Sequence, residues 1–155
     1  YIDALLWLLG NVKTVTGVMK NAAHKNSIEF EDTGVATLQM ESGVIGGLNW
    51  SVNTFNKNME VSLTLIAEKG TVKISGEYMN ILEYEATDGF SLQQTGTANA
   101  ANDYGFYKGS MSNHDKVYEN MMLALKDDLH PFTYADDGLK TVEAIEKIYN
   151  SVSLL

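Results

Sequence analysis

The fold is decided by the stretch VATLQMESGVIGGLNWSV, residues 35–52. Its two halves are short and rich in β-branched and aromatic side chains, a composition typical of strands. Between them stands Glu41-Ser42-Gly43, a connection with glycine last, which favours a hairpin whose final residue adopts a positive φ. The stretch therefore predicts two antiparallel strands, residues 35–40 and 44–52, joined by a tight turn.

Strand-like segments lie on both sides of this hairpin. A second connection, Glu68-Lys69-Gly70, repeats the turn chemistry. Val61, Leu63 and Leu65 alternate with polar residues, which indicates a sheet with one face buried more deeply than the other. The predicted strands are residues 12–19, 27–30, 35–40, 44–52, 60–66, 71–74 and 78–84.

Helical spacing of apolar residues marks the two ends of the chain. Residues 2–9 predict one helix, with Gly10 as its C-terminal stop. After a polar stretch, residues 87–112, two more helices follow, the first with Ser112 or Asn113 available as its N-cap. Acidic residues, Asp136 and Asp137, stand at the positive N-terminal end of the last helix. The apolar stripes of these two helices are Val117, Met121 and Leu125, and then Leu139, Val142, Ile145, Tyr149 and Val152.

This order of elements predicts an α+β fold, an open and mostly antiparallel sheet of six to seven strands with helices on one face. The length of 155 residues fits a single domain over residues 1–155. An apolar opposite face would need a cover, and a second subunit would supply one. We therefore expect a homo-oligomer formed through the open sheet face.

The charge and composition exclude several classes of partner. With 20 Asp and Glu against 11 cationic residues, all of them Lys, the net charge is −9. Such a surface repels phosphodiester backbones and anionic lipid, so we expect neither nucleic-acid nor membrane binding. No apolar run approaches the roughly 18–20 residues of a membrane span. Cysteine is absent, which excludes disulfides and thiolate chemistry and makes the cytoplasm the expected compartment.

Two groups of polar residues are candidates for chemistry. His24 lies near Glu29, Glu31 and Asp32 in sequence, and they form a ligand cluster only if the loop folds back; otherwise they are solvated. The other group is the long polar stretch, which is either functional or packed on a neighbour. Its aromatic, amide and cationic side chains around Tyr104, with His114 at the following helix start, suit a hydroxylated and partly anionic ligand.

Other candidates are weaker or absent. Trp50, Lys57 and Asn58 form a second polar and aromatic group near a strand end. No pair of histidines has metal-ligand spacing, so no metal is expected. Glycines 43, 46 and 47 lie between strands with no following helix, so they are not a dinucleotide fingerprint. We therefore expect no cofactor bound to this chain by itself.

Several short motifs resemble, in order and spacing, the C-terminal domain of the glucose–fructose oxidoreductase and inositol dehydrogenase (Gfo/Idh/MocA) family. They cover essentially the whole chain: Tyr1-Ile2-Asp3 with Trp7-Leu8, Glu31-Asp32-Thr33, Glu41 to Gly46, Glu68 to Val72, and Asp137-Gly138 with the closing helix. Leu48 to Val52, Lys57-Asn58, Asn102 to Gly105 and Asn113-His114 look like the subgroup that oxidises UDP-N-acetylglucosaminuronic acid at its 3-hydroxyl.

The resemblance implies a glyceraldehyde-3-phosphate dehydrogenase-like C-terminal fold and a parent enzyme that uses NAD or NADP. In the family an N-terminal Rossmann domain, absent from this chain, binds the nicotinamide and carries a catalytic Lys, and a catalytic His stands immediately before the Tyr-Ile-Asp positions. No complete catalytic set is implied here, with Asp3 as a supporting residue. The implied sugar-binding residues are Asp3, Lys57, Asn58, Tyr104, Asn113 and His114.

Three functions remain open from the sequence. The leading one is the substrate-binding and oligomerisation domain of an NAD(P)-dependent sugar or nucleotide-sugar oxidoreductase, inactive without its Rossmann domain. The alternative is a stand-alone module that forms oligomers through its sheet and catalyses nothing. A third is a partner subunit for a separate dehydrogenase chain.

Overall fold

The computed structural model describes residues 1–92, 100–106, 108–111 and 113–154. The elements follow in the order α1 (Ile2–Leu9), β1 (Val12–Lys20), β2 (Thr33–Met40), β3 (Ile45–Ser51), β4 (Leu63–Ala67), β5 (Gly70–Ser75), β6 (Ile81–Thr87), β7 (Ala101–Asp103), β8 (Lys108–Met111), α2 (His114–Ala124), α3 (Ala135–Ser151) and β9 (Val152–Leu154). The chain divides into two compact units, Tyr1–Phe55 with Thr133–Leu155, and Asn56–Phe132.

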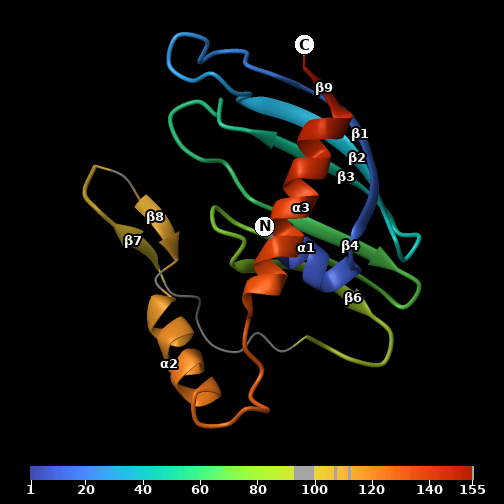
Figure 1. Cartoon of the computed structure of the whole chain (residues 1–155), viewed down its shortest axis with the longest axis vertical. Helices are drawn as coiled ribbons and strands as arrows, with labels where there is room; N and C mark the ends of the chain where they lie inside the picture. The colour runs from blue at the N-terminus through green and yellow to red at the C-terminus, as the bar shows by residue number, and fades with distance from the viewer. Residues whose placement is uncertain (93–99, 107, 112, 155) are drawn as a thin grey trace. The chain divides into compact units, whose positions relative to one another are not determined.

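The first unit is built on a four-stranded sheet in the order β3-β2-β1-β9. β1, β2 and β3 pair antiparallel, whereas β9 lies parallel to β1. The turn between β2 and β3 is the predicted hairpin, with Gly43 at a φ of 89°. α3 crosses one face of this sheet, and the chain then enters β9 directly, which pairs with β1 (Figure 1).

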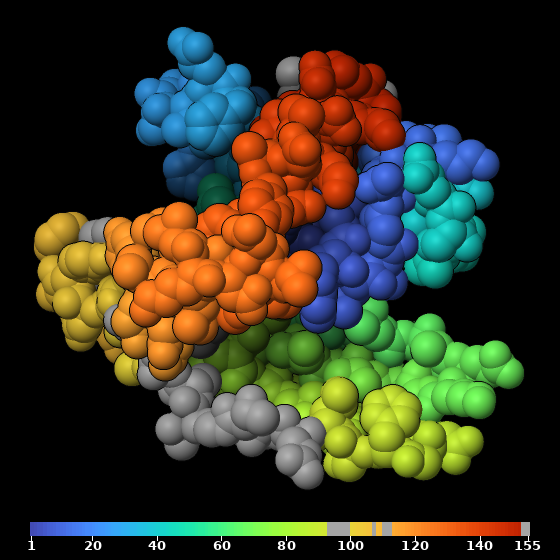
Figure 2. Space-filling view, turned by 60° about the horizontal axis from the view of Figure 1, so that its bottom comes forward, coloured from blue at the N-terminus to red at the C-terminus, as the bar shows by residue number. Residues whose placement is uncertain are grey.

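The buried core lies between α3 and the sheet. Even-numbered residues of β2 point toward the helix, and α1 packs at the edge of the same cluster. Ala144 and Ile148 are the buried residues of α3. Figure 2 shows α1 in blue beside α3 in orange to red. The buried apolar side chains are Val12, Val15, Met19, Ala36, Leu38, Met40, Ala144, Ile148 and Val152.

The opposite face of β1, β2 and β3 is exposed over a regular grid of paired residues. Val35 of β2 pairs with Val18 and Asn49, and Thr37 and Gln39 follow it along the same face. We call this surface the open face; it consists of Thr14, Thr16, Val18, Val35, Thr37, Gln39, Ile45, Gly47 and Asn49, all exposed. It mixes threonines with three exposed aliphatic side chains.

The second unit contains a three-stranded antiparallel sheet, β4-β5-β6, a two-stranded hairpin, β7-β8, and the helix α2. Its ladders are local: Ala67 pairs with Gly70 across the turn between β4 and β5. Among the residues of this unit whose burial the structure describes, which leave out 93–99, 107 and 110–112, only Ser75 is buried. The described hydrophobic core is therefore the core of the first unit.

The α+β class and the mostly antiparallel pairing are confirmed, but the prediction of one sheet of six to seven strands is wrong. The ladders form separate sheets of four, three and two strands. Residues 52–62, between β3 and β4, form no strand and are too many for a hairpin loop. Alternation of side chains marks each strand, but it does not say which strands share a ladder.

The predicted ends of helices and strands and the predicted turn residues are confirmed at some positions and wrong at others. α1 ends at Leu9, and Gly10 follows as its C-cap with a φ of 85°, the predicted stop. Asn113 is the N-cap residue of α2, while Ser112, the other N-cap candidate, lies outside the described residues. Gly70 does not adopt the positive φ expected of it, because the turn before it has only two residues and Gly70 already belongs to β5. Residues 27–30 are not a strand.

Candidate functional site

Asp32 is the centre of the most highly organised polar cluster in the first unit. Its side chain is fully buried and accepts hydrogen bonds from the backbone N–H groups of Ala22 and Ala23 at 2.8 Å and of His24 at 3.1 Å. The Nδ1 atom of His24 lies 3.1 Å from Oδ2 of Asp32. The buried carboxylate therefore holds the backbone of the loop between β1 and β2 in place through these hydrogen bonds.

The electrostatics of Asp32 follow from these contacts. Burial raises its pKa, but hydrogen bonds from Ala22, Ala23, Asn53 and His24 outweigh burial and hold the pKa well below the usual range. Asp32 is therefore ionised in the folded chain, and its role in this loop is structural. The expectation that it is solvated is wrong.

The same loop explains why residues 27–30 do not form a strand. The side-chain amide of Asn21 donates to the carbonyl oxygens of Ile28 and Phe30 at 2.9 and 3.0 Å. These carbonyls are thus satisfied by a side chain, which competes with pairing in a sheet. Glu31 accepts a hydrogen bond from Tyr149 of α3 at 2.7 Å. Within the described part of the chain, no three His, Cys, Asp or Glu residues form a group that could hold a metal ion.

Asp3 lies on the first turn of α1, where it meets α3. Its Oδ1 atom accepts a hydrogen bond from Oγ1 of Thr141 at 3.1 Å. Asp3 is exposed and Thr141 is half-buried. Asp3 could be singled out from the sequence, but Thr141 could not, because no spacing rule joins two residues so far apart in the chain.

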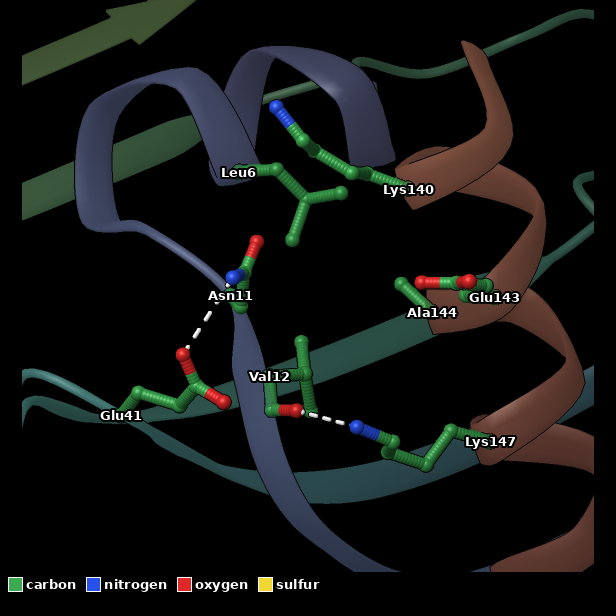
Figure 3. A pocket seen from close by; sticks show the side chains of 8 residues that line it. All are labelled: Leu6, Asn11, Val12, Glu41, Lys140, Glu143, Ala144 and Lys147. Carbon is green, nitrogen blue, oxygen red and sulfur yellow. Dashed lines mark hydrogen bonds between the residues drawn. The ribbon is translucent and has the colours of Figure 1, made fainter. Parts of the chain in front are cut away.

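A small hollow lies beside this contact, between α1, the start of β1 and α3 (Figure 3). Its volume is about 100 Å³, whereas sites for drug-sized ligands span roughly 300–1,000 Å³. Two donors that line it already have hydrogen-bond partners within the chain: Lys147 donates to the carbonyl of Val12 at 2.6 Å, and Asn11 donates to Glu41 at 3.2 Å. The hollow is too small for a nucleotide sugar.

The remaining predicted site residues belong to the second unit. Tyr104 lies in the turn between β7 and β8, which is shaped by a hydrogen bond from the Gly105 N–H to Asp103 at 2.8 Å. Asn113 and His114 stand at the start of α2, the next helix. Tyr104 and His114 are both exposed, as side chains that contact a ligand need to be.

Lys57 and Asn58 lie in the irregular segment before β4, and both are exposed. Asp3 belongs to the first unit and the other five residues belong to the second. Their grouping around one ligand stays a prediction. Residues 93–99, 107 and 112 of the polar stretch lie outside the described residues.

No helix in the described part of the chain is both long enough and apolar enough to cross a membrane.

Comparison with solved structures shows where this arrangement recurs. The WlbA dehydrogenase of Bordetella pertussis, solved with NADH and UDP-GlcNAcA, is 30% identical over 97% of this chain and 39% of its own, with a TM-score of 0.75. The WlbA dehydrogenase of Chromobacterium violaceum, solved with the same two ligands, is 25% identical over 97% and 41%, with a TM-score of 0.73. The chain thus spans about two fifths of the length of either enzyme.

Other comparisons bear on the fold and the family. A levoglucosan dehydrogenase solved with NADH and levoglucosan is 14% identical over 97% of this chain and 45% of its own, with a TM-score of 0.65, which shows the fold alone. The search of curated proteins finds no match. Residues 1–153 match the family model described as "Oxidoreductase family, C-terminal alpha/beta domain". The chain therefore belongs to the Gfo/Idh/MocA oxidoreductase family, as its C-terminal α/β domain.

Proposed function

We propose that the chain is the substrate-binding and oligomerisation domain of an NAD(P)-dependent enzyme that oxidises a hydroxyl of a nucleotide sugar of the UDP-N-acetylglucosaminuronate type. The observation that carries the proposal is the 30% identity, over 97% of the chain, to an enzyme solved with NADH and UDP-GlcNAcA. The hydride would pass to a nicotinamide held by a Rossmann domain outside this chain.

The residues of the chain itself do not fit a dinucleotide. A pyrophosphate is usually bound where a strand leads through a glycine-rich turn into a helix. In the described residues Gly46 and Gly47 lie within β3, and the chain then continues to irregular structure rather than to a helix. The chain also lacks Arg, and with it the bidentate fork that suits phosphate. The cofactor therefore belongs to the rest of the parent enzyme.

Within this proposal, Asp3 orients a substrate hydroxyl or the catalytic His of the parent enzyme. Tyr104, Asn113 and His114 border the sugar, and Lys57 with Asn58 contacts an anionic group. Support comes from chemistry and exposure. Tyrosine offers an apolar ring and a hydroxyl, amide and imidazole groups hydrogen-bond sugar hydroxyls, and lysine attracts a carboxylate or phosphate. These side chains are exposed in the second unit.

The experiment has two arms. The complete parent enzyme should reduce NAD or NADP when given UDP-N-acetylglucosaminuronate, whereas this chain alone should not. In the parent, Tyr104→Phe should raise KM several-fold, because it removes one hydroxyl from the sugar site. Tyr118→Phe, an equally conservative change at an exposed tyrosine of α2, is the control and should leave KM unchanged. A parent without turnover on any nucleotide sugar contradicts the proposal.

The proposal includes a homo-oligomer formed through the open face. Support comes from the exposed aliphatic side chains Val18, Val35 and Ile45 on a regular antiparallel surface. Light scattering should give a mass above that of one chain, and Val35→Lys should return it to the monomer mass. A monomeric wild-type protein contradicts this part of the proposal. A cytoplasmic location stays a prediction, based on the absence of cysteine.

The same surface favours one alternative, a module that associates through its sheet without binding substrate. Isothermal titration with UDP-N-acetylglucosaminuronate separates the two functions. The proposed domain should release or absorb heat on binding, and this signal should weaken in the His114→Gln variant. The module should give no heat with any nucleotide sugar.

A further inference from the structure

The contact between α1 and α3 contains one polar link at the end where Asp3 lies. Oγ1 of Thr141 stands 3.1 Å from Oδ1 of Asp3 and 3.5 Å from the carbonyl oxygen of Asp137, one turn earlier in α3. A threonine hydroxyl has a single proton to donate. The nearer acceptor is the carboxylate, and hydrogen bonds to charged groups are the stronger ones. The hydroxyl of Thr141 therefore donates to Asp3.

A threonine inside a helix can instead return its hydroxyl to the carbonyl four residues earlier, so the shorter distance to Asp3 identifies the acceptor. Lys140, next to Thr141 in sequence, pairs with Asp137 at 3.3 Å. The Cβ position of Asp3 is set by packing, because Ile2, Leu5 and Leu6 of α1 lie against the core that contains Ala144 and Ile148. Packing fixes the helix, and the hydroxyl of Thr141 fixes the direction of the carboxylate.

We infer that Thr141 is a positioning residue, which holds the Asp3 carboxylate in one orientation so that it can support the reacting groups of the parent enzyme. The inference rests on the proposed function for its catalytic consequence. Its structural half, a single orientation of Asp3 that depends on the hydroxyl of residue 141, belongs to this chain alone. α3 thus contributes to the active site through α1, without touching substrate.

The kinetic test uses the complete parent enzyme. Thr141→Val keeps the shape of the side chain and removes its hydroxyl, so kcat should fall about 3- to 10-fold, the range of one net hydrogen bond, with KM nearly unchanged. Thr141→Ser keeps the hydroxyl and should restore kcat. Thr64→Val, at an exposed threonine of β4, is the matched control and should change neither constant. Added to Asp3→Ala, which removes the acceptor altogether, Thr141→Val should cost nothing further.

The second test needs no activity and uses this chain. Couplings between the Hα and Hβ protons of Asp3, measured by nuclear magnetic resonance, report whether its side chain occupies one rotamer or several. The wild-type chain and Thr141→Ser should show one rotamer, and Thr141→Val should show averaged couplings. Circular dichroism should show the same helix content in all of these variants.

The outcomes distinguish the two claims. If the parent enzyme has no turnover, the proposed function fails, and the couplings of Asp3 still decide the inference. If the couplings are the same in Thr141→Val as in the wild type, or if kcat does not fall in an active parent, the inference is overturned. A loss of kcat that Thr141→Ser does not restore also overturns it.

Discussion

Replacing Ile148 by alanine should destabilise the chain strongly, while the same replacement of Val142 on the same helix should not. Ile148 is 7% exposed and belongs to the core, whereas Val142 is 60% exposed. Ile148→Ala removes roughly three methylene equivalents, about 2.4 kcal/mol of transfer free energy. The cavity left in the core adds to this, so we expect a loss of about 2.5–4 kcal/mol.

Val142→Ala removes side-chain atoms that contact mostly solvent. Alanine is also the better helix former, by roughly 0.5 kcal/mol. We therefore expect its free energy of unfolding to stay within about 0.5 kcal/mol of the wild type, or to rise slightly. Both replacements change a β-branched residue of α3 to alanine, so the difference between their free energies of unfolding reports the effect of burial.

Urea unfolding followed by circular dichroism measures both variants, with tryptophan fluorescence in a Trp7→Phe background, where Trp50 alone reports on the core, as a second probe. For a chain of this length the loss in Ile148→Ala corresponds to a fall in Tm of about 5–15 °C. Equal destabilisation by the two replacements would mean that α3 presents a different face to the sheet, and the reasoning from burial would fail. So would a neutral Ile148→Ala.

Three further changes test other contacts. The folded pKa of Asp32 is depressed below its ordinary value of 3.8, so the stabilisation that Asp32 contributes is present above pH ~4 and is lost as pH falls. Asp32→Asn should therefore lower Tm at pH 7, and its difference from wild type should shrink toward pH 2 in a thermal pH series. Gly17→Ala would place a Cβ against the backbone of β2, whereas a Cβ at Gly46 would meet no other atom. In urea unfolding, Gly17→Ala should lower the free energy of unfolding by about 1–3 kcal/mol or more, and Gly46→Ala should leave it unchanged. The hydrogen bond to Glu31, and to a lesser extent burial, raises the pKa of Tyr149 above its ordinary value of 10. The stabilisation from this hydrogen bond is therefore present below pH ~10 and is lost above the folded pKa. Tyr149→Phe should lower Tm at pH 7, and its Tm should converge with that of the wild type in strong alkali.

The sequence was a reliable guide to several features whose structural signal is local, although residues 27–30 form no strand and Gly70 has no positive φ. α1 could be predicted to end at Gly10, because a glycine can adopt the positive φ that terminates a helix. The hairpin between β2 and β3 could be predicted from Glu41-Ser42-Gly43 for the same reason. Asp3 entered the candidate site through a resemblance carried by adjacent residues. Each of these features is determined by residues that are adjacent or nearly adjacent in the sequence.

Other features depend on partners distant in sequence. β9 pairs in parallel with β1, through Gly17 and Val152, and no pattern in a short segment next to a helix marks such a pairing. Asp32 looked like a solvated loop residue, because only the folded loop brings three backbone N–H groups to its carboxylate. Its burial could not be read from its neighbours in the chain.

By itself, the sequence determined the α+β class, the hairpins, the acidic and arginine-free surface and the membership of the family, because these depend on composition and on short-range order. Only the tertiary structure decided which face of α3 is buried, how the strands divide into sheets, and that Thr141 meets Asp3 across helices at opposite ends of the chain. The apolar stripe read from the sequence of α3 is exposed at Leu139, Val142, Ile145 and Tyr149, whereas Ala144 and Ile148 are buried. The reason is that close packing against the sheet selects the buried face, and spacing along the helix does not show what lies opposite.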